Sequence, residues 1–458
     1  MKTITGAACL CTLLITMAFE ADGAATNRYM VEPGTAGITP AAPFISWATA
    51  GTNLKEVVDA ANDNDAGDHV IISNGTYWLT GQIYVGNVVL TNAAGDRTKV
   101  VINGNFPVYT NRCFMVMHSN ARLVGLTISN GAVTDLNGGG IYLTSGCVSN
   151  CVITGNRAWC DIGNGRGGGG LYISGGSVSD CEIVGNAIYT KTTNATAYQA
   201  AGGGGAFVTE GTLIRSRLAF NVASNRFGAG GGVYIASLGI VDQCNIISNV
   251  SYADYFGVAG GGGAYLNPNG RYPGYLLNST ITDNSTLDGG GGVGVYYGGI
   301  IRNCVIARNS SPKGGGVAMI AAGPKGRIEN CTIVSNALSG MRLTDQGGTP
   351  ISNVVNCIIY RNQGYALEAF GYNNCKTVMV ACCVSPGYES WNNPGGTTND
   401  PMLASIASNN FRLSSAQSSC YNRGTNLPWM EKAVDLDGHP RIDRPGGVAD
   451  IGAYEVNE

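Results

Sequence analysis

The sequence predicts an all-β protein, a right-handed parallel β-helix: a solenoid of about 10–12 coils with an N-terminal capping helix and a C-terminal capping region. Three observations predict this fold: an internal repeat, an alternation of apolar and polar residues within each repeat, and an excess of glycine. The chain of 458 residues contains 69 glycines, whereas only 12% of its residues are charged. Because 44% of the residues are hydrophobic and the formal net charge is −3, the chain can bury a large core and carries no excess positive charge for nucleic acid.

Eight segments carry the repeat and share one register. Each has an apolar first residue, Cys or Ser in fourth place, Ile or Leu in sixth place and Asn at the end. The segments are VSNCVITGN (148–156), VSDCEIVGN (178–186), LIRSRLAFN (213–221), VDQCNIISN (241–249), LLNSTITDN (276–284), IRNCVIARN (301–309), IENCTIVSN (328–336) and VVNCIIYRN (354–362). The Cys or Ser recurs at intervals of 25 to 35 residues. The shortest interval, 25 residues, is the length expected for one coil of constant circumference, and the longer intervals are explained by loop insertions. A heptad or helical-hairpin repeat does not give this pattern.

Each repeat contains the pattern of short, half-buried strands. The Cys or Ser and the residue two places later alternate with polar positions, which is the period of a strand. A second strand follows each of five glycine runs, which begin at Gly138, Gly167, Gly202, Gly230 and Gly260. The Asn that ends each segment is expected at a turn, because Asn tolerates left-handed backbone geometry and its amide can hydrogen-bond from coil to coil.

The cysteines fall into two groups. Seven occupy the inward position of the repeat, where replacement by Ser predicts small buried side chains and no metal site. These are Cys151, Cys181, Cys244, Cys304, Cys331, Cys357 and Cys382. Six others are the candidates for disulfides, with a pairing that spacing does not fix: Cys113, Cys147, Cys160, Cys375, Cys383 and Cys420.

The N-terminal part of the chain predicts export and a cap. Residues 1–25 read as a signal peptide, with Lys2 before an apolar run and small residues near the expected cleavage at Ala25. Residues 26–68 form an N-terminal segment and a capping helix, in which Asn53 and Glu56 resemble a capping box.

The rest of the chain divides into two parts. Residues 69–389 form the β-helix, and residues 390–458 form a C-terminal cap that covers its last strands. No stretch of the mature chain approaches the ~20 apolar residues of a membrane span, so we expect no transmembrane segment there.

Two resemblances follow from these segments. The capping helix, DHVIISNGTY (68–77) and the NCxIxxN units resemble the pectate-lyase-like superfamily of β-helices over roughly residues 45–390. The stretches DPMLA (400–404), NNFRLSSAQSSCYNRGTN (409–426) and DLDGHPRIDRPGGVADIGAYE (435–455) resemble the choice-of-anchor Q domain. This second resemblance implies a bacterial protein that is secreted or held at the cell surface. Neither resemblance specifies a substrate.

A search for catalytic residues finds no recognisable set. Polygalacturonase-like hydrolysis needs paired carboxylates, and the motifs of that family are absent. The clustered acidic residues with which pectate lyases hold calcium are not found on successive coils, so no cofactor is predicted, and calcium is expected only if the protein is a lyase. The three histidines are widely separated. The best catalytic candidates, all weak, are Asp161, Lys191 and Asp254.

Aromatic residues in the segments that follow the Asn turns are the best binding candidates. We expect residues 157–166, 187–201, 222–227 and 250–259 to be loops along one edge of the rod. Their aromatic side chains are of the kind that contact sugar faces or a protein partner. They are Trp159, Tyr189, Tyr198, Phe227, Tyr252, Tyr255 and Phe256. A column of outward aromatics, Tyr142, Tyr172, Phe207, Tyr234 and Tyr265, is expected to stack and stabilise the adjoining strands.

Three functions remain open from the sequence. The first is a non-catalytic exported or cell-surface β-helix whose loop edge binds a polysaccharide or a cell-surface glycan. The second is a polysaccharide lyase or glycoside hydrolase with an unfamiliar active site. The third is a structural spacer in a surface assembly.

Overall fold

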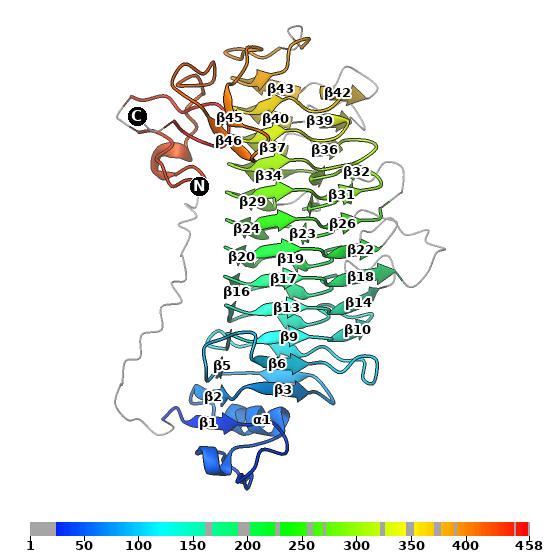
Figure 1. The fold of residues 1–458 in the computed structure, drawn as a ribbon, viewed down its shortest axis with the longest axis vertical. Helices are drawn as coiled ribbons and strands as arrows, with labels where there is room; N and C mark the ends of the chain where they lie inside the picture. Colours follow the sequence, from blue (N-terminus) through cyan, green and yellow to red (C-terminus); the bar gives the residue numbers. More distant parts are fainter. Residues whose placement is uncertain are drawn as a thin grey trace.

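The computed structural model describes residues 24–160, 167–190, 202–224, 230–253, 260–268, 272–320, 326–344, 352–370, 377–388, 392–443 and 446–456. They form one long parallel β-helix whose coils stack along the long axis (Figure 1). Sheet A has thirteen strands, sheet B twelve and sheet C eleven, and a shorter sheet D has six. The predicted fold class is thereby confirmed, whereas most of the expected signal peptide lies outside the described residues.

One coil shows how the repeat folds. It runs through β11 (Ile141–Leu143) in sheet C, β12 (Cys147–Ser149) in sheet A, β13 (Val152–Thr154) in sheet B and β14 (Arg157–Cys160) in sheet D. Each strand pairs in parallel with its equivalent in the next coil, so that Ile153 lies beside Ile183. Both side chains are fully buried because alternate residues of every strand point into the shared core.

Sheet B positions the candidate site. Its outward side chains alternate with the inward Ile or Leu of each repeat, and the sheet is built from consecutive coils in one register. Its strands are β3 (Gly75–Trp78), β6 (Val100–Asn103), β9 (Thr127–Ser129), β13, β17 (Glu182–Val184), β21 (Arg217–Ala219), β25 (Asn245–Ile247), β30 (Thr280–Thr282), β35 (Val305–Ala307), β38 (Thr332–Val334), β41 (Ile358–Tyr360) and β44 (Cys383–Val384).

The helix α1 (Leu54–Asn64) lies across the N-terminal end of the rod (Figure 1). Asn53 is its N-cap, as predicted, and Leu54, Val57, Val58 and Ala61 are buried. The capping pattern differs in detail from a capping box: the Asn53 side chain accepts from the backbone N–H of Lys55 and donates to the Glu56 carboxylate at 3.1 Å.

The terminal Asn residues form a buried amide ladder through the rod. Asn156 Nδ2 donates to Asn186 Oδ1 at 3.0 Å and to the Ile128 carbonyl at 3.0 Å, and the pattern repeats from coil to coil up to Asn362. The prediction of coil-to-coil amide bonds is therefore confirmed. The expected left-handed geometry of Asn itself is wrong, because the left-handed residue is the one before it, as at Phe220 with φ 54°.

The twelve described cysteines are buried, and no disulfide joins any two of them. In the inward column the thiol donates to a carbonyl two residues earlier, as Cys244 does to Asp242 at 3.2 Å. Of the six candidates for disulfides, Cys375 lies outside the described residues, and the other five are among these buried cysteines, so no disulfide is formed among the five.

The segments expected as loops begin as strands of sheet D. Residues 157–160, 187–190, 222–224 and 250–251 are strands, and their inward side chains pack in a small core with Val133, Ala158, Cys160, Ile188 and Ala223. The alternation that buries residues in the three main sheets simply continues past the Asn turn. The strands are β10 (Ala132–Thr134), β14, β18 (Ala187–Thr190), β22 (Val222–Ser224), β26 (Val250–Ser251) and β31 (Ser285–Thr286).

The C-terminal region lies mostly along the side of the rod. Near its start the Pro394 carbonyl accepts from Ala381 N–H at 2.9 Å, next to the last coil. The hairpin of β45 (Leu403–Ser405) and β46 (Asn410–Leu413) and the segments after it pack on the outer face of sheet B (Figure 1). In the last coils the outer face of sheet B is apolar, and Val305 and Ile358 are buried there under the C-terminal region. The same face is polar in the preceding coils, so it can remain exposed to water.

Candidate functional site

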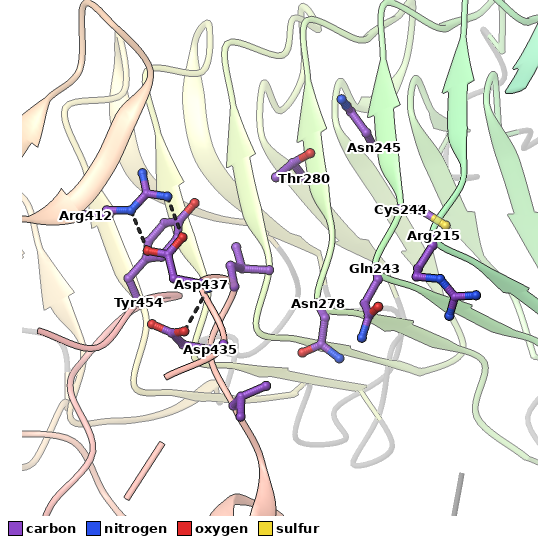
Figure 2. Close-up of a pocket in the computed structure, with 13 residues that line it drawn as sticks. Arg215, Gln243, Cys244, Asn245, Asn278, Thr280, Arg412, Asp435, Asp437 and Tyr454 are labelled. Carbon is purple, nitrogen blue, oxygen red and sulfur yellow. Dashed lines mark hydrogen bonds and ion pairs between the residues drawn. The ribbon is translucent and has the colours of Figure 1, made fainter. Parts of the chain in front are cut away.

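A groove of about 560 Å³ separates the C-terminal region from the rod (Figure 2). Its rod wall comes from three successive coils and its other wall from the segment around Asp435. The rod contributes Arg215, Gln243, Cys244, Asn245, Asn278 and Thr280, and the C-terminal region contributes Arg412, Val434, Asp435, Leu436, Asp437, Gly438 and Tyr454.

The rod wall presents amide, hydroxyl and guanidinium groups. Asn245 and Thr280 are paired neighbours at the first position of β25 and β30, one place before inward residues of the core, so they point outward. Gln243 and Asn278 occupy left-handed turn positions with φ 52° and 44°. The Asn278 amide donates to Asp242 Oδ1 at 2.7 Å, which fixes its orientation toward the groove edge.

Arg215 supplies a positive charge that is already paired. It makes two hydrogen bonds of 2.9 Å to the Asp180 carboxylate in the preceding coil. This contact lowers the pKa of Asp180 and raises the pKa of Arg215. The pair therefore remains ionised, and it adds directional donors to the wall without adding net charge.

The opposite wall is held by a second bidentate pair. Arg412 donates to both oxygens of Asp437, at 2.5 Å each, and its guanidinium lies 4.8 Å from the centre of the Tyr454 ring (Figure 2). The hydrogen bonds from Arg412 lower the pKa of Asp437. An ionised carboxylate clamped in this way does not serve as a general acid.

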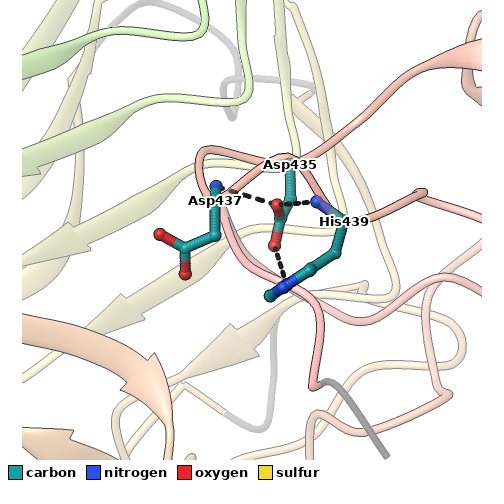
Figure 3. Close-up of side chains that lie close together, drawn as sticks. All are labelled: Asp435, Asp437 and His439. Carbon is teal, nitrogen blue, oxygen red and sulfur yellow. Dashed lines mark hydrogen bonds and ion pairs between the residues drawn. The ribbon is translucent and has the colours of Figure 1, made fainter.

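Asp435, Asp437 and His439 form a cluster in which one potential ligand atom from each residue lies within 4.8 Å of the others (Figure 3). Asp435 Oδ1 accepts from the backbone N–H groups of Asp437 and His439, both at 2.8 Å, and Oδ2 accepts from Glu455 N–H at 2.8 Å. Because Arg412 occupies both oxygens of Asp437, a cation would have to displace protein donors. The cluster is thus a poor fit for calcium and acts as a turn that shapes the wall.

Two carboxyl groups with raised pKa lie behind this wall. Burial raises the pKa of Glu455 to about 7 and the pKa of Asp450 to about 6. Glu455 accepts from the fully buried Arg441 at 2.7 Å, so it belongs to the packing of the C-terminal region on the rod. Neither group is among the described residues that line the groove, whose lining offers hydrogen-bonding groups and paired charges.

The catalytic candidates Asp161, Lys191 and Asp254 all lie outside the described residues. The same is true of four binding candidates: Tyr198, Phe227, Tyr255 and Phe256. Of the other three, Tyr252 is 49% exposed just after β26, and Trp159 and Tyr189 are half-buried neighbours in sheet D.

Trp159 and Tyr189 stack on each other, with ring centres 5.5 Å apart and planes at 20°. Phe106 lies on the other side of Trp159 at 5.3 Å. Stacking covers part of the ring surface that a sugar could otherwise contact. The outward column is also confirmed as a stack, for example Phe207 and Tyr234 at 4.4 Å and 9°.

The groove residues were not predicted as a site. The outward polar positions at Asn245 and Thr280 follow from the repeat register, but nothing in that register indicates which segment lies opposite. The partner wall lies more than 130 residues further along the chain, so only the folded chain brings the two together.

Comparison with known proteins supports the fold. A family described as "Right handed beta helix region" matches residues 231–398. The search of curated proteins found no matching relative. The match and the parallel coils define a right-handed β-helix protein. Among the described residues, no helix is long and apolar enough to cross a membrane.

Proposed function

We propose that this protein is a non-catalytic β-helix that binds a polysaccharide or a cell-surface glycan in the groove between the C-terminal region and sheet B. The observation that carries the proposal is the lining of the groove, where amide and hydroxyl side chains stand beside two paired guanidinium groups and one aromatic ring. Sugars present dense hydroxyl groups, and such sites fix them with a few directional donors and acceptors.

The groove supports this proposal better than the aromatic edge does. Its rod wall brings Asn245 and Thr280 into the lining of the groove, whereas Trp159 and Tyr189 stack on each other. Arg412 bonds to both oxygens of Asp437 and lowers its pKa, so this carboxylate is held as part of the wall and does not serve as a general acid.

Export completes the proposal. The signal-peptide pattern in residues 1–25 and the resemblance of residues 435–455 to the choice-of-anchor Q domain both suggest a secreted or surface-held bacterial protein. We also propose that the chain belongs to the pectate-lyase-like superfamily of β-helices, a membership that does not by itself specify an activity.

The test uses the mature chain, residues 26–458, with immobilised glucomannan, xyloglucan, laminarin and polygalacturonate. We expect retention on at least one polymer and no new reducing or unsaturated ends. The double variant Asn245→Ala, Thr280→Ala should bind about thirtyfold more weakly, because each of the two lost hydrogen bonds contributes roughly 1 kcal/mol.

Asn353→Ala is the matched control, since Asn353 is an amide on sheet A, paired with the exposed Arg327 and not among the residues that line the groove. It should bind like the wild type. New chain ends would contradict the non-catalytic role, and equal binding by the double variant and the control would show that the groove is not the site.

A further inference from the structure

A second hollow, of about 210 Å³, lies at the N-terminal end of the rod beside Trp78. Trp78 is the last residue of β3, and its side chain is 62% exposed. Met30 and Ile83 form part of the floor, and Thr52 and Thr80 bring hydroxyl groups to the lining. The hollow thus joins a largely uncovered indole ring to an apolar floor and a few polar groups.

This hollow and the groove lie on the same face of the rod. Trp78 pairs with Asn103, which pairs with Ser129, and Ser129 pairs with Thr154. These residues alternate with the inward column that contains Ile153, so they belong to the outer side of sheet B, as Asn245 and Thr280 do, although Asn103 and Ser129 are buried there. From β3 to β30 there are seven strand steps of about 4.8 Å, which places the two sites roughly 34 Å apart.

The charge of the hollow favours a neutral ligand. Among the described residues that line the hollow, only Lys55 is charged, and it pairs with Asp59 at 2.5 Å. No unmatched charge is left there to select an acidic sugar. An exposed indole offers a flat apolar face, which matches the C–H face of a pyranose ring, and the nearby hydroxyl groups can bond to the ring substituents.

We propose that the hollow beside Trp78 binds one neutral sugar residue of a glycan chain whose other part occupies the groove. The inference rests on the proposed function and adds a second contact and a ligand class to it. Two sites on one face bind a long chain more tightly than either binds alone, because the second contact forms at a high effective concentration. Short oligosaccharides, which cannot reach both sites, lack this gain.

The test compares wild type, Trp78→Ala and Trp78→Phe on long glucomannan, xyloglucan and laminarin and on short oligosaccharides of the same three polymers. Trp78→Ala should lower the affinity for the long neutral polymer at least tenfold, whereas Trp78→Phe should keep most of it. Binding of the wild-type chain should also shield Trp78 from acrylamide quenching. Tyr365→Ala, which removes a 57% exposed aromatic ring from sheet C, is the control and should bind like the wild type.

Each outcome separates the two proposals. If Trp78→Ala keeps wild-type affinity while Asn245→Ala, Thr280→Ala loses it, the second site is wrong and the groove stands. Preference for polygalacturonate over the neutral polymers would overturn the proposed ligand class. Failure of the wild type to bind any of the polymers would overturn both proposals.

Discussion

The guanidinium of Arg441 donates a hydrogen bond through Nη2 to Oδ1 of Asn303, in the turn between β34 (Gly299–Arg302) and β35. Arg441 is fully buried, and it also donates to the Glu455 carboxylate and to the Gly452 carbonyl. One side chain therefore connects the rod to the last described part of the C-terminal region.

Arg441→Ala should loosen the C-terminal region. The substitution leaves the buried Glu455 carboxylate without its partner, and breaking a buried pair costs about 3–5 kcal/mol. Chemical unfolding and limited proteolysis measure the change, with faster cleavage expected after residue 400. Arg327→Ala, at a side chain that is 50% exposed, should change neither quantity by much. Equal protection of the two variants would argue against the role of Arg441.

Stability should fall as the pH rises from about 5 to 8. The folded-state pKa values of Glu455, about 7, and Asp450, about 6, are raised by burial above the ordinary values of 4.5 and 3.8. The folded chain therefore binds protons that the unfolded chain releases, and this stabilisation is present below the ordinary pKa and lost through pH 6–7. The Glu455 contribution is on the order of 3 kcal/mol.

The free energy of unfolding in urea at pH 5, 6, 7 and 8 measures this dependence. Glu455→Gln keeps the size of the side chain and removes its titration, so its profile should be flatter than that of the wild type. An unchanged slope in Glu455→Gln would mean that other groups carry the pH dependence.

Removing one amide of the ladder should destabilise the rod. Asn249 Nδ2 donates to the Leu218 carbonyl and to Asn284 Oδ1, and its own Oδ1 accepts from Asn221. Asn249→Ala removes these buried hydrogen bonds, at a cost of about 1–3 kcal/mol for each group left unsatisfied. The measurement is thermal unfolding, and Asn74→Ala, at an exposed turn, is the control that should leave the melting temperature nearly unchanged.

The cysteine column should accept serine at a single coil. Ser279 already occupies the equivalent position, where its hydroxyl donates to the Leu277 carbonyl at 2.5 Å and accepts from Cys244 N–H at 3.0 Å. Cys244→Ser can bond in the same way and should cost less than about 1.5 kcal/mol. Cys244→Asp places a charge in the core and should prevent folding, as monitored by circular dichroism and soluble yield.

The sequence by itself determined the solenoid, because the residues of each repeat determine its strands and its turn locally. Within nine residues, the alternation around Ile153 identifies the strand and its inward face, and Asn156 identifies the turn. Equivalent residues of successive coils lie beside each other, which sets the register. The same local rule explains one error: the alternation continues past Asn156 into Ala158 and Cys160, so a short sheet forms where loops were expected.

Tertiary structure alone decided where the C-terminal region lies and hence where the groove is. The outer face of sheet B turns apolar at Val305 and Ile358, and burying it against Phe411 and Ile451 removes that surface from water. This brings Asp437 opposite Thr280, although no periodicity links the two. Contacts across such distances depend on complementary surfaces that exist only once the coils have stacked, which is why the repeat predicts the rod and not its binding site.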